Sequence, residues 1–490
     1  MAMETTVKRT DIIVLVFVVL LAIVVRCAFL EFTIDDAYIT LRYAENIARG
    51  NGFVYNPGEH VYGTTTPLLT FILAAFSRMT QHALLAGKIL NILADAAVAV
   101  MLFGFAGRFG GSRWVGYLAA LLYGLNPIPI KWSASGMETG LYIFLICLSF
   151  WQYERQRFRA AYIFAALATL TRIDGALIFG VLLTADIVHR RRGLWTDAVI
   201  GAFPLLLWAG FALLYFGSPI PHSAWAKRIT YGGHAPLEAF GEILRKLLFR
   251  HGAYSAIAAI PAFIGMFWIT VRRRRGWPMV AWWFGYWAFF VLTGSKLQGW
   301  YLAPAVWVYT LSTALGVGII ARIVVEKRLS SWARAWFARP ALAIGALTVI
   351  SVSMVLIRER YVEEKSTIGT LEGQVSRPIG LWLAEHAAPT DTVCLESIGA
   401  VGYYSGLYIL DEVGLVSPAV VPFNQQTPGT PNFGGIVRAF TPTYYVWWES
   451  WEQQWWRSRP KLMAWLDSAY TRQAVFSGPG TAAWAIWRRK

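Results

Sequence analysis

Two adjacent carboxylates, Asp35 and Asp36, follow the first long apolar stretch of the chain, residues 12–30. A charged side chain at the centre of a membrane helix costs about 2.5 to 3.5 kcal/mol, so a pair at the boundary with water can stay ionised. Adjacent carboxylates repel each other, which raises the proton affinity of one and suits it to act as a general base. Two alternatives remain: a divalent cation bound by Asp35 or Asp36, and a helix cap, for which one Asp suffices.

Further ionisable side chains interrupt apolar sequence later in the chain. Glu138 lies in a short segment between two hydrophobic stretches, and Arg172 and Asp174 stand at the end of another. They can be helix-terminal charges or a simple ion pair. Ionisable residues at membrane depth are nevertheless functional candidates by default, so both segments are candidate parts of a site.

Three cations, His222, Lys227 and Lys296, lie in segments that the overall charge pattern places away from the basic side of a membrane. A lipid-linked phosphate would pair with them, because Lys binds phosphate as a compact charge and His can donate a hydrogen bond. Contact of snorkelling side chains with phospholipid headgroups is the competing explanation.

The composition is that of a polytopic membrane protein. Of the 490 residues 56% are hydrophobic, and the mean hydropathy is +0.46. The net charge of +16 comes from short basic clusters between apolar stretches. This pattern favours contact with an anionic leaflet over nucleic-acid binding. The three cysteines indicate neither a disulfide framework nor a metal-thiolate site.

At about 20 residues per crossing, the apolar stretches predict eleven transmembrane helices. They cover residues 11–30, 84–107, 114–131, 139–153, 160–172, 175–189, 196–216, 254–271, 278–294, 301–321 and 340–357. With a cytoplasmic N-terminus, the basic clusters fall on the cytoplasmic side, among them Arg190 to Arg192 and Arg272 to Arg275. Counting Pro67 to Met79 as a crossing would reverse that pattern, so we expect a re-entrant or interfacial helix there.

This topology gathers the candidate residues on the outer side of the membrane. We expect a transmembrane module over residues 1–358, whose outer loop 31–66 carries the Asp pair, and an extracytoplasmic mixed α/β domain over 359–490. Within the loop, the spacing of apolar residues from Thr33 to Arg49 predicts an amphipathic helix on the membrane surface. The α/β domain has a helical pattern at 378–386 and strand patterns at 392–396, 408–410, 444–448 and 483–487.

Several short motifs, taken in order, resemble the GT-C class of membrane glycosyltransferases, most of all the actinobacterial cell-wall arabinofuranosyltransferases and their bacterial relatives. They are residues 35–44 (DDAYITLRYA), 52–59 (GFVYNPGE), 62–67 (YGTTTP), 135–139 (SGMET), 171–175 (TRIDG), 221–223 with Lys227, and 398–405 (IGAVGYYS) with Asp411 and 414–415. The residues before Tyr301 depart from the pattern, which often has Arg there, and leave Lys296 as the nearby cation.

The resemblance implies a GT-C-type bundle with its active site where the first outer loop meets the membrane. Asp35 is the implied base, with Asp36 beside it. The implied donor is a polyprenyl-phosphate sugar, with arabinofuranose suggested only by the likeness, and the acceptor is a glycan, a glycolipid or a protein. The donor phosphate would contact His222, Lys227, Lys296 and Arg172. Substrate would contact Tyr38, Arg42, Tyr62, Thr64, Thr65, Glu138, Asp174, Trp300 and Tyr301.

The expected reaction is sugar transfer on the outer face of the plasma membrane, with inversion at the anomeric carbon. No Gly-rich phosphate loop is present, and no cofactor is indicated apart from a divalent cation that the Asp pair would share. Two other functions compete. A lipid or sugar transporter, or flippase, would line its path with such charges, although we see no internal repeat. A non-catalytic scaffold would assemble envelope enzymes through its outer domain.

Overall fold

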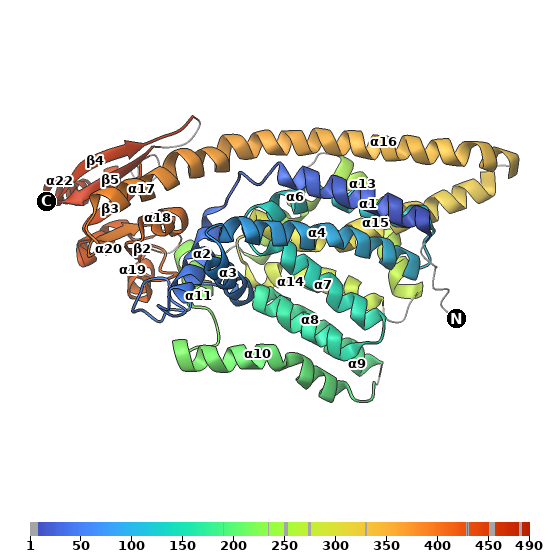
Figure 1. Cartoon of the computed structure of the whole chain (residues 1–490), viewed down its shortest axis with the longest axis horizontal. Coiled ribbons are helices and arrows are strands. Elements are labelled where there is room, and N and C mark those ends of the chain that lie inside the picture. The colour runs from blue at the N-terminus through green and yellow to red at the C-terminus, as the bar shows by residue number, and fades with distance from the viewer. Residues whose placement is uncertain are drawn as a thin grey trace.

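The computed structural model describes residues 8–189, 191–233, 235–248, 253–272, 276–328, 331–427, 429, 431–449, 456–479 and 483–490. Arg190 and Arg273 to Arg275 of the predicted basic clusters lie outside these residues. A bundle of helices carries a small sheet-containing region at one end, and the N-terminus lies towards the opposite end (Figure 1). This confirms the prediction of a helical bundle followed by a small C-terminal α/β part.

The bundle helices follow the predicted apolar stretches. Their bounds are α1 Arg9–Cys27, α4 Ala83–Arg108, α5 Arg113–Gly124, α6 Pro127–Ala134, α7 Thr139–Glu154, α8 Phe158–Thr171, α9 Ala176–Val188, α10 Leu194–Phe216, α13 Ala253–Arg272, α14 Trp277–Thr293, α15 Ala303–Arg328 and α16 Ser331–Glu364. The single crossing predicted over 114–131 is wrong, because Asn126 caps a new helix that starts at Pro127. The Asn126 side chain accepts a hydrogen bond from the Ile128 amide at 3.0 Å.

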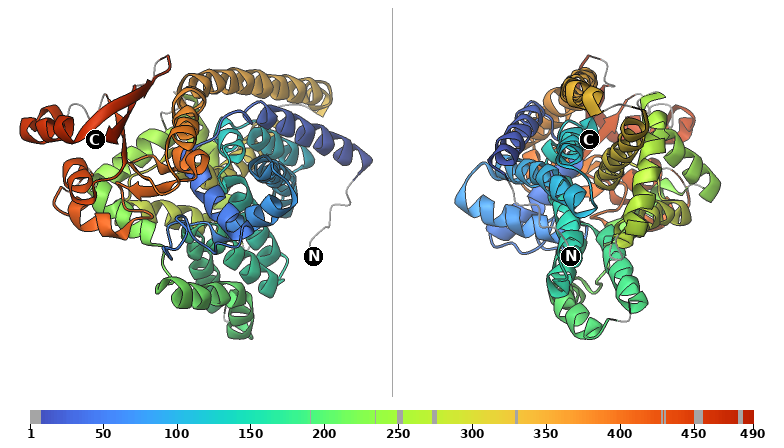
Figure 2. Two further views of the ribbon diagram at one scale, coloured as in Figure 1. Left: turned by 60° about the vertical axis from the view of Figure 1, so that its left-hand side comes forward. Right: turned by 90° about the vertical axis from the view of Figure 1, so that its right-hand side faces the viewer.

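Four of the described segments are long and apolar enough to cross a membrane: α1, α4, α10 and Gly299–Val324, which includes most of α15. Helices α6 and α7 make a fifth if this pair, bent by 117°, counts as one span. The total of eleven crossings stays a prediction. Helices α8, α9 and α10 project from one side of the bundle (Figure 2). On α10, Leu206, Leu207 and Leu214 are exposed, as expected for a face that meets lipid.

Glycines lie where two helices of the bundle pack most closely. Helices α13 and α15 contact each other closely. A Cβ atom on Gly265 would lie 1.8 Å from the Ser312 carbonyl oxygen, and one on Gly316 would lie 1.8 Å from the Pro261 carbonyl oxygen. Small residues at such crossings allow backbones to approach, as is typical of membrane helices.

Three shorter helices lie at the end of the bundle that faces the sheet: α2 Asp35–Ala48, α3 Pro67–Met79 and α11 His222–Tyr231 (Figure 1). A fourth, α12 Pro236–Leu248, contacts α13 and α14. The predicted helices at 33–49 and 67–79 are confirmed as helices. Protein covers the first of these helices, because α2 packs between α3 on one side and α18, Ile398–Ser405, on the other, and its predicted position at the membrane surface stays a prediction. Burial of both sides fixes the position of the Asp pair at its start.

The C-terminal sheet has five strands in the order β2-β1-β3-β5-β4. Their bounds are β1 Thr392–Leu395, β2 Tyr408–Asp411, β3 Tyr444–Trp448, β4 Tyr470–Phe476 and β5 Trp484–Arg489. Strand β1 pairs in parallel with β2 and β3, and the other pairs are antiparallel. Strand β4 was not predicted from the sequence. It is a mostly exposed edge strand and begins directly after helix α22, Pro460–Ala469.

Helix α16 continues without a break past residue 358, so the predicted domain boundary falls inside it. Two π-helical segments, Lys365–Gly369 and Glu372–Ser376, then lead into α17, Arg377–His386. The long helix runs along the outside of the bundle and connects it to the sheet (Figure 1).

Candidate active site

A cavity of about 470 Å³ lies between the end of the bundle and the carboxyl end of β1. Its volume is in the range typical of small-ligand sites. The structure brings eleven of the predicted site residues to its wall. They are Asp35, Asp36, Thr64, Thr65, Glu138, Arg172, Asp174, Lys227, Lys296, Trp300 and Tyr301.

The two adjacent aspartates have different surroundings. Both carboxylate oxygens of Asp35 accept backbone hydrogen bonds, from the amides of Gly399 and Ala400, each at 2.8 Å. Asp35 therefore caps the start of α18, and burial raises its pKa to about 6 although the two amides oppose the shift. The backbones are so close that a Cβ atom on Gly399 would lie 1.9 Å from the Asp35 carbonyl oxygen.

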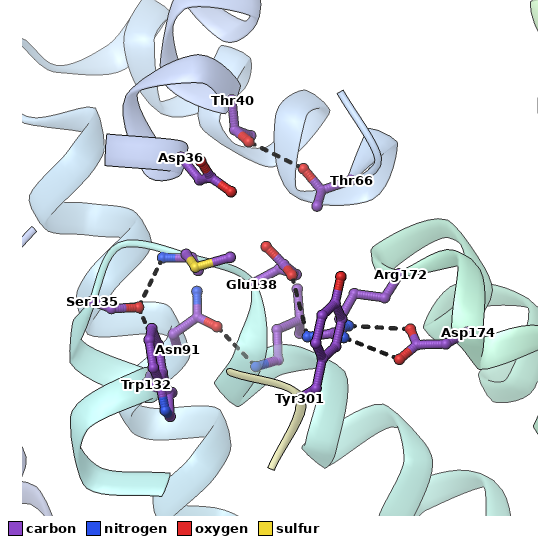
Figure 3. Close-up of polar contacts among 12 residues, drawn as sticks. Asp36, Thr40, Thr66, Asn91, Trp132, Ser135, Glu138, Arg172, Asp174 and Tyr301 are labelled. Atoms are coloured by element: carbon purple, nitrogen blue, oxygen red, sulfur yellow. Dashed lines mark hydrogen bonds and ion pairs between the residues drawn. The ribbon is translucent and has the colours of Figure 1, made fainter. Parts of the chain in front are cut away.

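Asp36 is the member of the pair that faces the open cavity, across from Glu138 and Arg172 (Figure 3). Its side chain is 34% exposed, and its Oδ2 atom lies 3.4 Å from the Lys227 ammonium. The charge of Asp36 raises the pKa of Lys227, so this ammonium stays protonated. A partly exposed carboxylate and its cationic partner thus lie side by side in the cavity wall.

Arg172 supplies a buried cation on the opposite wall (Figure 3). Its Nε and Nη2 atoms donate to the two carboxylate oxygens of Asp174 at 3.1 and 3.0 Å, and the side chain is only 5% exposed. The third nitrogen, Nη1, lies 3.8 Å from a Glu138 oxygen and makes no hydrogen bond with the described residues. The guanidinium centre lies 4.9 Å from the Tyr301 ring centroid and 5.1 Å from that of Tyr142. A fixed guanidinium with a spare donor suits an anion.

The turn between α6 and α7 positions Glu138. Gly136 adopts φ of +88°, a left-handed conformation that favours glycine. The side chain of Asn91 accepts from the Leu141 amide at 2.9 Å and so holds the first turn of α7 against α4 (Figure 3). The approach is close, because a Cβ atom on Gly140 would lie 2.3 Å from the Asn91 carbonyl oxygen.

Hydroxyl groups line the wall beside the Asp pair. The Oγ1 atom of Thr66 lies 3.1 Å from that of Thr64 and 3.2 Å from that of Thr40 on α2. These bonds tie the loop before α3 to the helix that carries the aspartates. Thr65 lines the cavity between them.

Four predicted site residues do not line the cavity. Arg42 is buried, and its guanidinium donates to the backbone carbonyls of Tyr55 (3.0 Å), Gly402 (2.5 Å) and Leu407 (2.6 Å). It therefore fixes the outer loop to the C-terminal region. Tyr38 donates to Glu372 at 2.7 Å. Their predicted contact with substrate has no support from this geometry.

The other two, Tyr62 and His222, lie next to each other behind the cavity wall. The Tyr62 hydroxyl accepts a hydrogen bond from the Trp208 indole at 2.8 Å, and its carbonyl accepts from the His222 amide at 2.8 Å. Burial lowers the pKa of His222, which therefore favours the neutral imidazole. The ring does not line the cavity, so the predicted contact of His222 with a donor phosphate has no support from this geometry.

Glu396 and Tyr231 are among the polar residues of the cavity wall that sequence reasoning missed. The Tyr231 hydroxyl donates to the Glu396 carboxylate at 2.6 Å. A signal was present, because Glu396 ends a predicted strand and ligands often bind at the carboxyl ends of parallel strands. Lys88 was also missed. Its ammonium donates hydrogen bonds to the carbonyl oxygens of Leu30 and Phe32, just before the Asp pair, at 2.8 and 3.0 Å.

Within the described part of the chain, no three His, Cys, Asp or Glu side chains come together as a metal site. Metal binding by Asp35 or Asp36 would therefore need ligands from substrate or water. Asp35 has both oxygens engaged by amides, which leaves Asp36 as the more accessible ligand.

Comparison with known proteins gives one family model and several relatives. A model described as a domain of unknown function, DUF8728, matches residues 365–487. The chain is 28% identical to the terminal beta-(1->2)-arabinofuranosyltransferase of Mycobacterium tuberculosis, in a match that covers 39% of this chain and 34% of that protein. The matched part thus spans about a third of the relative's length.

Two solved structures share the fold over nearly the whole chain. ArnT from Cupriavidus metallidurans, solved with undecaprenyl phosphate, is 15% identical with a TM-score of 0.59, over 96% of this chain and 97% of that one. The oligosaccharyltransferase AglB from Archaeoglobus fulgidus, solved with an inhibitory peptide and a dolichol-phosphate, is 13% identical with a TM-score of 0.56, over 98% of this chain and 74% of that one. The chain therefore has the fold of ArnT and AglB, and the resemblance to GT-C glycosyltransferases predicted from its sequence is confirmed.

Proposed function

We propose that this protein is a membrane glycosyltransferase that moves a sugar from a polyprenyl-phosphate donor to an acceptor hydroxyl. The observation that carries the proposal is that an accessible carboxylate, Asp36, lines the same cavity as two separate cationic groups, Lys227 and Arg172. The solved relatives support the donor class, because ArnT and AglB were solved with undecaprenyl phosphate and with a dolichol-phosphate.

The donor phosphate would lie between the two cations. Arg172 offers Nη1, which has no hydrogen-bond partner among the described residues, and Lys227 offers an ammonium whose present partner is 3.4 Å away. Lys296 adds a third charge at the cavity wall. These groups stabilise the phosphate as negative charge develops on it in the transition state.

Asp36 is the base in this proposal, rather than Asp35. Both oxygens of Asp35 already accept amide hydrogen bonds, so its role is to hold α18 in place. When the donor phosphate draws Lys227 away, the Asp36 oxygen that now contacts the ammonium becomes free to accept a proton. Binding of the donor would thereby prepare the carboxylate that accepts a proton.

The chemical step is a direct displacement. The acceptor oxygen forms a bond to the anomeric carbon while its proton passes to Asp36. The bond between that carbon and the phosphate oxygen breaks, and its electron pair leaves with the polyprenyl phosphate. A single displacement inverts the anomeric centre, and Asp36 later releases its proton to water.

The finer assignments are part of the same proposal. The arabinofuranosyltransferase relative supports arabinofuranose as the donor sugar. The proposed acceptor is a glycan, a glycolipid or a protein. The basic clusters support a cytoplasmic N-terminus and a cavity that opens, with the C-terminal domain, on the outer side of the plasma membrane.

The test is transfer by the purified full chain in proteoliposomes with a radiolabelled polyprenyl-phosphate sugar. Wild-type protein should form labelled glycoside, and Asp36→Asn should form at least about 100-fold less, the usual contribution of a general base. Unchanged turnover in Asp36→Asn would contradict the mechanism. Movement of the intact lipid across the bilayer without product would favour a flippase, and no activity of either kind would favour a scaffold.

A further inference from the structure

Glu396 places a carboxylate in the cavity from the C-terminal sheet. It follows β1 directly and lies two residues before α18, the helix that Asp35 caps. Its Oε1 atom accepts the Tyr231 hydroxyl hydrogen bond at 2.6 Å. Tyr231 ends α11 and lies one helical turn after Lys227, so two elements of the site hold the Glu396 side chain in position.

The second oxygen of Glu396, Oε2, makes no hydrogen bond with the described residues. The side chain is half-buried and lines the cavity, where burial raises the pKa of its carboxyl. Lys296 also lines the cavity, and its positive charge partly offsets that shift. An oxygen that has no protein donor and belongs to a cavity-lining carboxylate is available to accept a hydrogen bond from a ligand.

Sugar hydroxyls are the donors that the cavity would receive under the proposed function, on which this inference rests. A carboxylate accepts hydrogen bonds from one or two hydroxyls, and it discriminates against an analogue that lacks them, because those hydrogen bonds are then lost. The phosphate cations Lys227 and Arg172 cannot make that distinction, because they contact the leaving group that all such donors share.

We propose that Glu396 is a specificity-determining residue that hydrogen-bonds a hydroxyl of the sugar in the cavity. The contacted hydroxyl belongs either to the donor sugar or to the acceptor sugar, and both have the same hydrogen-bonding chemistry. Tyr231 is its positioning residue, because it fixes the Oε1 atom and leaves Oε2 for the ligand.

The experiment measures kcat/KM for wild type and Glu396→Gln with donors and acceptors that each lack one hydroxyl. With intact substrates, Glu396→Gln should lower kcat/KM about 10- to 100-fold, the loss expected for a hydrogen bond to a charged group. With the analogue that lacks the contacted hydroxyl, wild type and variant should react equally. A deoxy donor that removes the difference identifies the donor sugar as the ligand, and a deoxy acceptor identifies the acceptor.

Two controls separate this role from a structural one. Polyprenyl phosphate without sugar should bind wild type and Glu396→Gln with the same Kd. Glu385→Gln, which removes an 80% exposed carboxylate on α17, should leave every kinetic constant unchanged.

Three results would overturn the inference. They are an unchanged kcat/KM in Glu396→Gln, an equal loss with every deoxy analogue, and a matching loss of polyprenyl-phosphate binding. Wild-type protein that transfers no sugar from any polyprenyl-phosphate donor would overturn the proposed function itself, and this inference with it.

Discussion

Replacing Asp36 with Asn should abolish turnover and at the same time tighten the binding of polyprenyl phosphate. The Lys227 ammonium lies 3.4 Å from the Asp36 carboxylate, and the two side chains are 44% and 34% exposed. The Coulomb energy at that separation is about 1 kcal/mol in water, and half-exposed pairs of this kind contribute roughly 0.2 to 1 kcal/mol. In Asp36→Asn this competing attraction is gone, so the phosphate gains the lysine without displacing it from a carboxylate.

The expected gain is about 2- to 5-fold in Kd, from about 0.5 to 1 kcal/mol. Calorimetry of the detergent-solubilised or nanodisc protein with sugar-free polyprenyl phosphate measures it. The matched control is Asp35→Asn, which should show no gain because the Asp35 oxygens pair with amides and not with Lys227. The double variant Asp36→Asn with Lys227→Met should lose the gain. Equal or weaker binding by Asp36→Asn would refute the exchange of Lys227 between carboxylate and phosphate.

Three further outcomes are expected. Arg172→Lys should raise the Kd for polyprenyl phosphate about 10-fold or more, because only the planar guanidinium can pair with Asp174 through two nitrogens and offer the third to the phosphate. An unchanged Kd in the same calorimetric assay would contradict this. The pKa of Asp35 is raised from 3.8 to about 6, so its ionisation is less favourable in the folded protein, and stability should fall as the pH rises from about 4 to about 6. Over that rise in pH, the Tm of wild type should decline more than the Tm of Asp35→Asn, and an equal decline in both would contradict this. Gly399→Ala should destabilise the protein by about 1 to 3 kcal/mol, because the added Cβ atom would lie 1.9 Å from the Asp35 carbonyl oxygen. The control Gly373→Ala should have no such effect, because a Cβ atom there has no other atom within 4 Å. Equal denaturation midpoints for the two variants would contradict the packing of α18 on α2.

Hydropathy alone predicted most of the bundle, because a membrane helix needs a long apolar stretch and such stretches are easy to locate. The limits of α3 and β3 agree with the expected 67–79 and 444–448. Hydropathy does not predict a break inside an apolar stretch, as at 114–131, where Asn126 and Pro127 divide the stretch into two helices.

Eleven of the predicted site residues line one cavity, but the different surroundings of Asp35 and Asp36 were not predicted. The resemblance pointed to Asp35 as base, yet the structure engages Asp35 with α18, whose residues are more than 360 positions away in the chain. Arg42 was expected at the substrate and instead binds carbonyls as far away as Leu407. Such contacts depend on the tertiary packing of α2 against the C-terminal region, and no local sequence pattern encodes them.

The most direct test of the proposed site is an experimental structure of the full chain with polyprenyl phosphate bound. The proposal predicts a phosphate oxygen within about 3 Å of both Arg172 Nη1 and Lys227 Nζ, with Lys227 moved away from Asp36. A phosphate bound outside this cavity, or one that leaves the ion pair between Lys227 and Asp36 intact, would contradict it.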